Sequence, residues 1–334
     1  MLKPLLFAFF AFSSLAQAGT REVAHNIARE RFLHAQDHLS SFLFTCRAQP
    51  QECAATPREL TLMRRIYFEL LDIQGTGVRS KLVFASEAEA PGTFMLDGQV
   101  RIAKTGSAPG TDIYINTDLI VREDLIDGVI PFTVDEAVAV LVHEYGHHHH
   151  DAVSGDVTHE ELDLLGAKVR QSLLATRREV VISTSDWPVL TSPLSLTFYS
   201  IGSSQGQNQE QSIVHLAGPF GLIDLGDIAN GLTCPRSYYM GDLNFEGHPF
   251  KIYFKSFTIE DPLINAESLV LPITVDQANV FCLNHLREDE YNVFDGYRNG
   301  MLRLPFSRGP SGDVQFDRSR VEFSMTTPPD IYWQ

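Results

Sequence analysis

The chain has 334 residues, enough for one large domain or two of ordinary size. It carries 26 basic and 42 acidic residues, a formal net charge of −16 at pH 7. This acidic balance argues against partners that attract basic patches, namely nucleic acids and anionic membrane surfaces. The charge is consistent with simple solubility, so it identifies no partner by itself.

The first 18 residues have the pattern of a secretory signal peptide. Lys3 is a minimal basic region, residues 5–12 are continuously apolar, and Ala16-Gln17-Ala18 has the small-x-small pattern of a cleavage site. This apolar run is too short to span a bilayer, and no later stretch of the sequence is long and apolar enough. We therefore expect cleavage before Gly19, leaving a secreted or periplasmic protein that does not span a membrane.

The four cysteines agree with an oxidising compartment. Cys46 and Cys53 lie close together between two helical patterns, whereas Cys234 and Cys282 lie far apart in the C-terminal half. The simplest expectation is two disulfides, Cys46–Cys53 and Cys234–Cys282, although the sequence leaves other pairings open. A cysteine metal site is a weaker alternative because neither pair has CxxC spacing.

Two helices and three short strands are expected in the first third of the chain. Residues 21–46 have a loose helical spacing of apolar side chains, and Thr56-Pro57-Arg58-Glu59 combines an N-cap, a proline at the first helical position and a capping-box acid. The helix that begins there is expected to end at Gly75 and Gly77. Strand patterns separated by Pro-Gly and Asp-Gly turns follow at residues 81–84, 94–102 and 112–116.

The strongest chemical signal is an HExxH motif at residues 143–147. Residues four apart lie on one face of a helix, so His143 and His147 can direct both imidazoles at a single ion. Glu144 follows the first of these histidines, where its carboxylate can reach a water on the metal and act as general base.

The residues before the motif predict the helix that it requires. Thr133 and Glu136 form a capping box, and Pro131 stops regular structure from continuing in from upstream. Residues 134–142 are almost wholly apolar, which predicts a helix that is buried over most of its circumference.

A catalytic zinc ion takes three protein ligands and keeps one position open. Thr158 and Glu161 form another capping box, and His159 falls in the first turn of the helix that begins there. Asp163 lies one turn further along the same face, where a carboxylate can orient a ligating imidazole. His159 is thus the favoured third ligand. Glu160 and Asp163 are alternative ligands, and the alternative for His159 is an ordinary surface histidine.

The motif is followed by His148, His149, His150 and Asp151. His150 and Asp151 are three and four residues beyond His147, so they share its helix face and are expected nearest the metal. We expect Asp151 to be a supporting carboxylate, and the other histidines to lie around the helix end.

From Trp187 onward, β-type runs replace the helical periodicity. The clearest runs are residues 194–201, 212–216, 250–259, 268–274, 279–283 and 320–325. They predict a β-rich, sandwich-like accessory domain over residues 186–334, following a domain over residues 19–185. No catalytic constellation and no internal repeat are visible in it.

The motif and its flanks resemble the zincin metallopeptidases, most of all the HtpX-like and CAAX-endopeptidase-like gluzincins. Gly146 makes the motif HExGH, as is common there. Residues 94–100 (FMLDGQV) are similar to the family's NAF-x3-G-x-I/V segment, with Gly92 in place of its Asn. Residues 159–167 (HEELDLLGA) mirror its E-x-E-A-D-x-x-G-A segment. The likeness covers roughly Val83 to Leu174 and implies an α+β, zincin-like metallopeptidase domain over residues 19–185.

The resemblance also implies residue roles. The family's zinc-binding Glu falls on His159 and its supporting Asp on Asp163, although here the ligand type differs and the gap from His147 is shorter. In zincins the last strand before the motif is an edge along which an extended peptide can pair, and Tyr114-Ile115-Asn116 is the expected edge here.

We therefore expect an exported zinc peptidase in which His143, His147 and His159 hold Zn²⁺ and Glu144 is the general base. Its substrate would be a protein or peptide, including one of the cell envelope. The alternative is a non-catalytic secreted binding protein with a structural or degenerate metal site, and the intact Glu144 argues against it. The oxyanion donor, the substrate and the oligomeric state do not follow from the sequence.

Overall fold

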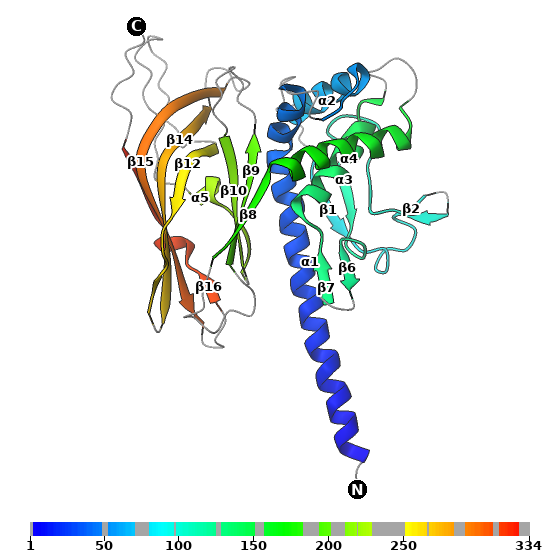
Figure 1. Cartoon of the computed structure of the whole chain (residues 1–334). Coiled ribbons are helices and arrows are strands. Elements are labelled where there is room, and N and C mark those ends of the chain that lie inside the picture. Colours follow the sequence, from blue (N-terminus) through cyan, green and yellow to red (C-terminus); the bar gives the residue numbers. More distant parts are fainter. Residues whose placement is uncertain are drawn as a thin grey trace. The chain divides into compact units, whose positions relative to one another are not determined.

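The computed structural model describes residues 3–48, 53–70, 80–96, 98–124, 128–150, 157–182, 194–201, 211–218, 220–228, 251–265, 267–283, 291–309 and 314–326. The protein combines helices with β-sheets, which confirms the predicted α+β class (Figure 1). It divides into two compact units, Met1–Leu174 and Ala175–Gln334. In the described part of the chain, no helix is both long and apolar enough to span a bilayer.

Helix α1 (Lys3–Ala48) supplies much of the core of the first unit. Its buried side chains recur every three or four residues and so form one stripe: Ala24, Ala28, Phe32, Ala35, Leu39, Phe42, Leu43 and Cys46. Arg31 Nη1 donates to the carbonyl oxygens of Pro131 (3.2 Å) and Phe132 (2.9 Å), just before the motif helix. Gln36 Nε2 donates to the Tyr145 hydroxyl inside that helix at 2.7 Å. These bonds fix α1 against the HExxH segment.

Helix α2 (Pro57–Leu70) begins as the sequence predicts. The Thr56 amide donates to Glu59 Oε2 (2.7 Å) and the Glu59 amide donates to Thr56 Oγ1 (3.3 Å), which completes the capping box. The predicted Cys46–Cys53 disulfide is present and joins the ends of the first two helices. Cys234 lies outside the described residues, as does the predicted end of α2 at residues 75–77.

A three-stranded sheet has the order β1-β5-β4, with β1 (Leu82–Ala85) parallel and β4 (Ala103–Lys104) antiparallel to β5 (Ile113–Asn116). The predicted strands at residues 81–84 and 112–116 are confirmed. The pattern at residues 94–102 instead forms a hairpin of β2 (Met95–Leu96) and β3 (Gln99–Val100). A second hairpin, β6 (Val121–Asp124) with β7 (Gly128–Pro131), was not predicted.

The prediction of Tyr114-Ile115-Asn116 as the sheet edge is wrong. Tyr114 pairs with Val83 of β1 on one side and with Lys104 of β4 on the other, so β5 is the central strand. A central strand has both rows of backbone groups occupied and cannot accept an added peptide.

The two edge strands of this sheet are β1 and β4, and β4 is the one antiparallel to β5. The Asn116 amide donates to the Ile102 carbonyl oxygen at 2.8 Å, which sets the alternation of the antiparallel ladder. In that alternation, the N–H and C=O of Ala103 point away from β5. The outward row of backbone groups therefore belongs to β4, which is two residues long and gave no strand signal in the sequence.

Helices α3 (Val134–His147) and α4 (His159–Thr176) begin at the predicted capping boxes. The Glu136 amide donates to Thr133 Oγ1 (3.3 Å) and the Thr133 amide to Glu136 Oε2 (2.9 Å). At α4 the Thr158 amide donates to Glu161 Oε2 at 2.9 Å. Most of α3 is buried, as its apolar sequence predicts.

The second unit is built on one ten-stranded sheet of order β16-β15-β14-β12-β10-β9-β8, with β11 beside β10, β13 beside β14 and β17 beside β15. Its elements are β8 (Arg177–Ile182), β9 (Leu194–Ile201), β10 (Gln211–Gly218), β11 (Gly221–Asp224), α5 (Leu225–Ile228), β12 (Lys251–Ile259), β13 (Leu263–Ile264), β14 (Ser268–Leu283), β15 (Tyr291–Arg308), β16 (Val314–Phe316), the short 3₁₀ helix Arg318–Arg320 and β17 (Glu322–Thr326). One buried cluster includes Ile182 of β8 and Val314 of β16, from opposite ends of the sheet order. The sheet therefore curves around a common core.

Candidate metal centre

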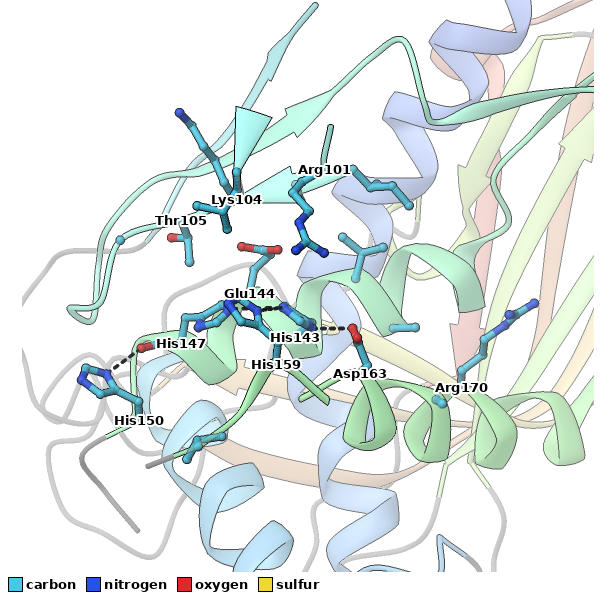
Figure 2. A pocket seen from close by; sticks show the side chains of 18 of the residues that line it. Arg101, Lys104, Thr105, His143, Glu144, His147, His150, His159, Asp163 and Arg170 are labelled. Atoms are coloured by element: carbon cyan, nitrogen blue, oxygen red, sulfur yellow. Dashed lines mark hydrogen bonds and ion pairs between the residues drawn. The ribbon is translucent and has the colours of Figure 1, made fainter. Parts of the chain in front are cut away.

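Three imidazole nitrogens converge where α3 meets the start of α4. His143 Nε2 lies 3.1 Å from His147 Nε2 and 3.4 Å from His159 Nδ1, as Figure 2 shows for the first pair. All three ligand atoms lie within 4.8 Å of one another, so the cluster could hold a metal ion. The structure thus brings together the three histidines that the sequence predicts as ligands.

The spacing of these nitrogens fits a tetrahedral cation. Zinc–nitrogen bonds of about 2.0–2.1 Å at tetrahedral angles separate two ligand nitrogens by about 3.3 Å. The two separations, 3.1 and 3.4 Å, bracket this value. Nitrogens that face each other at such distances need a proton or a cation between them, because lone pairs repel.

The protonation states also suit a cation. Burial, helped by the nearby imidazoles of His143 and His159, lowers the pKa of His147 to about 4. Burial likewise lowers the pKa of His143, although the negative charge of Asp163 opposes this effect. Both rings are thus mainly neutral at pH 7, and neutral imidazole is the form that binds metals.

Asp163 contacts a different histidine from the one the sequence suggests. Its Oδ1 lies 2.8 Å from Nδ1 of His143, not beside His159, and this contact turns His143 Nε2 toward the cluster. Glu160 and Asp163, the alternative ligands, are not part of the three-histidine group. Asp151, the other expected supporting carboxylate, lies outside the described residues.

Two glycines allow α4 to approach α3 closely enough to deliver His159. A Cβ atom at Gly166 would lie 2.5 Å from the backbone oxygen of Ala139. A Cβ atom at Gly146, inside the motif, would lie 2.4 Å from Cδ2 of Leu162. Larger residues at these positions would push the two helices apart.

Glu144 lies beside the histidine cluster with its carboxylate on the side of Arg101 (Figure 2). The residue is 5% exposed, and its Oε2 atom has no hydrogen-bond partner within the described structure. Burial and, next, the charge of Asp163 raise the pKa of Glu144 to about 8, while Arg101 opposes the rise. A cation in the cluster would favour the ionised carboxylate.

These groups share a pocket of about 1010 Å³. It is lined by the β4 segment Arg101–Ser107, by Leu96 and Val100 of the hairpin and by one face each of α3 and α4. A pocket of this size accommodates a ligand of several residues. The sequence gave no signal for Arg101, which lies outside every motif.

His148 and His149 contact a buried carboxylate instead of solvent. Glu69 of α2 places Oε1 2.8 Å from His148 Nδ1 and Oε2 2.8 Å from His149 Nε2. Nε2 of His148 in turn lies 2.7 Å from Oγ1 of Thr105, directly after β4. Glu69 thereby connects the end of the motif helix to the edge of the sheet. Its distance from the motif in sequence concealed this role.

His150 lines the same pocket but does not join the three-histidine group. Its Nδ1 atom lies 3.1 Å from the carbonyl oxygen of His147, as Figure 2 shows. It therefore remains near the centre, as the helix spacing predicts, without contributing a ligand atom to the cluster.

In comparisons with models of protein families, with curated proteins and with solved structures, nothing matches this chain. The geometry of the site is therefore the basis for assigning a function.

We predict that Gly166→Ala weakens binding of a metal ion at the three-histidine cluster, tested with added Zn²⁺, by at least about tenfold and lowers the free energy of unfolding by about 1–3 kcal/mol, because the new methyl group meets backbone. The loss should occur even though alanine is the better helix former. Gly146→Ala should have a smaller effect, because it meets only the end of the Leu162 side chain. Chelator competition and thermal melting measure both quantities. Unchanged zinc affinity in Gly166→Ala would contradict this account.

Glu69 gives a pH-dependent prediction. Burial alone would raise its pKa, but bonds from His148, His149 and the Gly110 amide outweigh burial and hold the pKa at about 2. A depressed folded-state pKa stabilises the protein above pH 4.5, and this contribution is lost as the pH falls toward 2. Glu69→Gln should therefore be less stable at pH 7, by about 1–3 kcal/mol, and the deficit should shrink on acidification through this window.

Urea unfolding at a series of pH values measures this difference. Glu89→Gln, which removes an exposed carboxylate, is the matched control and should follow the parent protein. A deficit in Glu69→Gln that stays constant from pH 7 to pH 2 would show that the charge of Glu69 is not what stabilises the fold.

Proposed function

We propose that the protein is an exported zinc-dependent metallopeptidase, with a zincin-like first unit and a β-rich accessory second unit. The observation that carries the proposal is the convergence of three imidazole nitrogens beside Glu144, a buried carboxylate with an unpartnered oxygen. A purely structural metal site has no use for such a carboxylate. In a hydrolase, it is the base.

A bound zinc ion would supply an acidified water and a positive charge for the substrate carbonyl. Glu144 takes the proton from the attacking water and later delivers it to the leaving amine, which cannot depart as an anion. Glu144 lines the pocket, and its buried Oε2 atom has no hydrogen-bond partner in the described structure that would compete for this proton. Asp163 holds the His143 ring in the orientation that keeps Nε2 in the cluster.

A peptide substrate would bind along β4, in place of the strand that the sequence suggested. The outward backbone groups of Ala103 can pair with an extended chain, and Arg101 to Ser107 line the pocket that contains Glu144. Such pairing recognises backbone and so suits proteins or peptides in general. In a secreted or periplasmic setting, the substrates include proteins of the cell envelope.

The central test measures metal content and peptidase activity on the same preparations. The parent protein should contain one zinc ion per chain, and both His143→Ala and His159→Ala should lose it. Glu144→Gln should keep the zinc ion but lose peptide hydrolysis by about 10²–10⁴-fold, the usual contribution of a general acid–base group. His150→Ala, in the pocket but outside the cluster, is the control and should retain zinc.

Each deviation has a definite meaning. Activity that survives in Glu144→Gln would refute the mechanism. Zinc lost from His143→Ala but kept by His159→Ala would move the third ligand to Glu160 or Asp163. A parent protein without metal or activity would favour the non-catalytic binding protein.

Export is tested by the mass of the mature chain. Expressed in a bacterial host with a secretion pathway, the protein should appear in the periplasm or medium with Gly19 as its first residue. Ala18→Lys should block cleavage at that bond and shift the intact mass accordingly. A full-length parent chain that stays in the cytoplasm would rule out the signal peptide.

A further inference from the structure

The pocket contains a cation, Arg101, to which the hydrolytic chemistry assigns no role. Arg101 lies two residues before the edge strand β4, and its side chain extends toward Glu144 and His143 (Figure 2). Arg101, His143 and Glu144 line the same pocket, so a substrate bound beside Glu144 can also contact the guanidinium.

The backbone of Arg101 is anchored, but its guanidinium is not paired. The Arg101 amide donates to the Phe94 carbonyl oxygen at 2.9 Å, and its own carbonyl oxygen accepts from Asn116 Nδ2 at 3.3 Å. Nε of Arg101 is buried, and no described residue gives it a hydrogen-bond partner. A guanidinium whose backbone is held in place and whose buried Nε has no partner among the described residues is suited to bind an anion.

Arg170, which also lines the pocket, differs from Arg101 because it is paired with acidic side chains. Arg170 Nε lies 3.0 Å from Asp135 Oδ2, and its Nη2 lies 3.5 Å from Glu136 Oε1. Those two acids tie Arg170 to the first turn of α3. Arg101 has no such acidic partner within the described residues. Glu144, toward which Arg101 extends, is the base in the proposed mechanism.

We propose that Arg101 binds a carboxylate of the substrate, so that the peptidase prefers peptides with an acidic side chain or a free C-terminal carboxylate next to the cleaved bond. This inference rests on the proposed peptidase function. Guanidinium and carboxylate match as two parallel N–H···O bonds, which a neutral amide does not reproduce.

The surroundings of Arg101 increase its preference for a carboxylate over a neutral group. Ile102 and Ala139 line the same pocket with apolar side chains, and Nε of Arg101 is buried, so water screens a charge pair there less than at an open surface. A neutral substrate would leave the guanidinium desolvated and unpaired. Since a hydrogen bond to a charged group contributes about 1.5–3 kcal/mol, the preference should be about 10- to 100-fold.

The test uses peptides in matched pairs. One pair differs only by Glu or Gln beside the cleaved bond, and the other only by a C-terminal acid or amide, which separates the two sources of carboxylate. The parent protein should have a kcat/KM about 10- to 100-fold higher for the acidic member of at least one pair. Arg101→Gln should remove this preference by slowing cleavage of the acidic member alone, chiefly through KM. Arg101→Lys should restore part of it.

Two results overturn the proposal. Equal loss of kcat for acidic and neutral peptides in Arg101→Gln would make Arg101 a donor to the reaction's oxyanion. Lys104→Gln removes a positive charge from the same pocket and should keep the acidic preference. If it abolishes that preference as completely as Arg101→Gln does, a general positive field is responsible instead of a contact.

A binding measurement separates this inference from the peptidase proposal. Calorimetric titration of the four peptides into Glu144→Gln and into the Glu144→Gln, Arg101→Gln double variant requires no turnover. Acidic peptides that bind about 10- to 100-fold more tightly when Arg101 is present support the inference, even if the parent protein cleaves none of them. Equal affinity of both proteins for all four peptides overturns it, whether or not the parent is a peptidase.

Discussion

The close crossing of helices α3 and α4 is the constraint on which the candidate site depends. An HExxH helix alone offers two nitrogens, and the third must come from a separate element held at ligand distance. Gly166 against the Ala139 backbone and Gly146 against Leu162 permit that approach. The capping box at Thr158 then fixes where α4 begins, so that its first residue, His159, meets the cluster. The packing of α4 against α3 and the residue at which α4 begins together determine which side chain completes the cluster.

The acidic side chains at the start of α3 are paired with arginines, whereas the acid in the motif is not. Asp135 and Glu136, at the start of the helix, are buried and paired with Arg170, and Glu136 also pairs with Arg122. These pairs offset the cost of burying the acids. Glu144 lies about two and a half turns later at similar burial, yet no ion pair joins it to a basic side chain in the described structure. Burial disfavours the ionised form of Glu144 and raises its pKa to about 8. Strongly shifted pKa values of this kind are common at functional sites.

What the sequence could predict was mainly local. The capping boxes at Thr56, Thr133 and Thr158 involve residues three apart, so the helix starts were correct to the residue. Strand pairing is not local. The central position of Tyr114 depends on β4, and a strand of two residues is too short to show an alternation of apolar and polar side chains. Strand β15 was missed although it is 18 residues long. It contains Asn299-Gly300, a pair typical of hairpin turns, and Asn299 has φ 52° beside a register shift in the pairing with β17, so a left-handed residue here marks a bulge.

The identity of the third ligand affects what the pocket can bind. Three histidine ligands would leave a bound divalent ion its full charge, whereas a carboxylate in place of His159 would cancel one unit. Arg101 adds a further positive charge on the strand side of the pocket. Asp163 opposes them, but its side chain is 73% exposed, so solvent screens much of its charge. With a divalent cation bound, the pocket would therefore be more positive than the acidic chain as a whole, which would favour an anionic substrate.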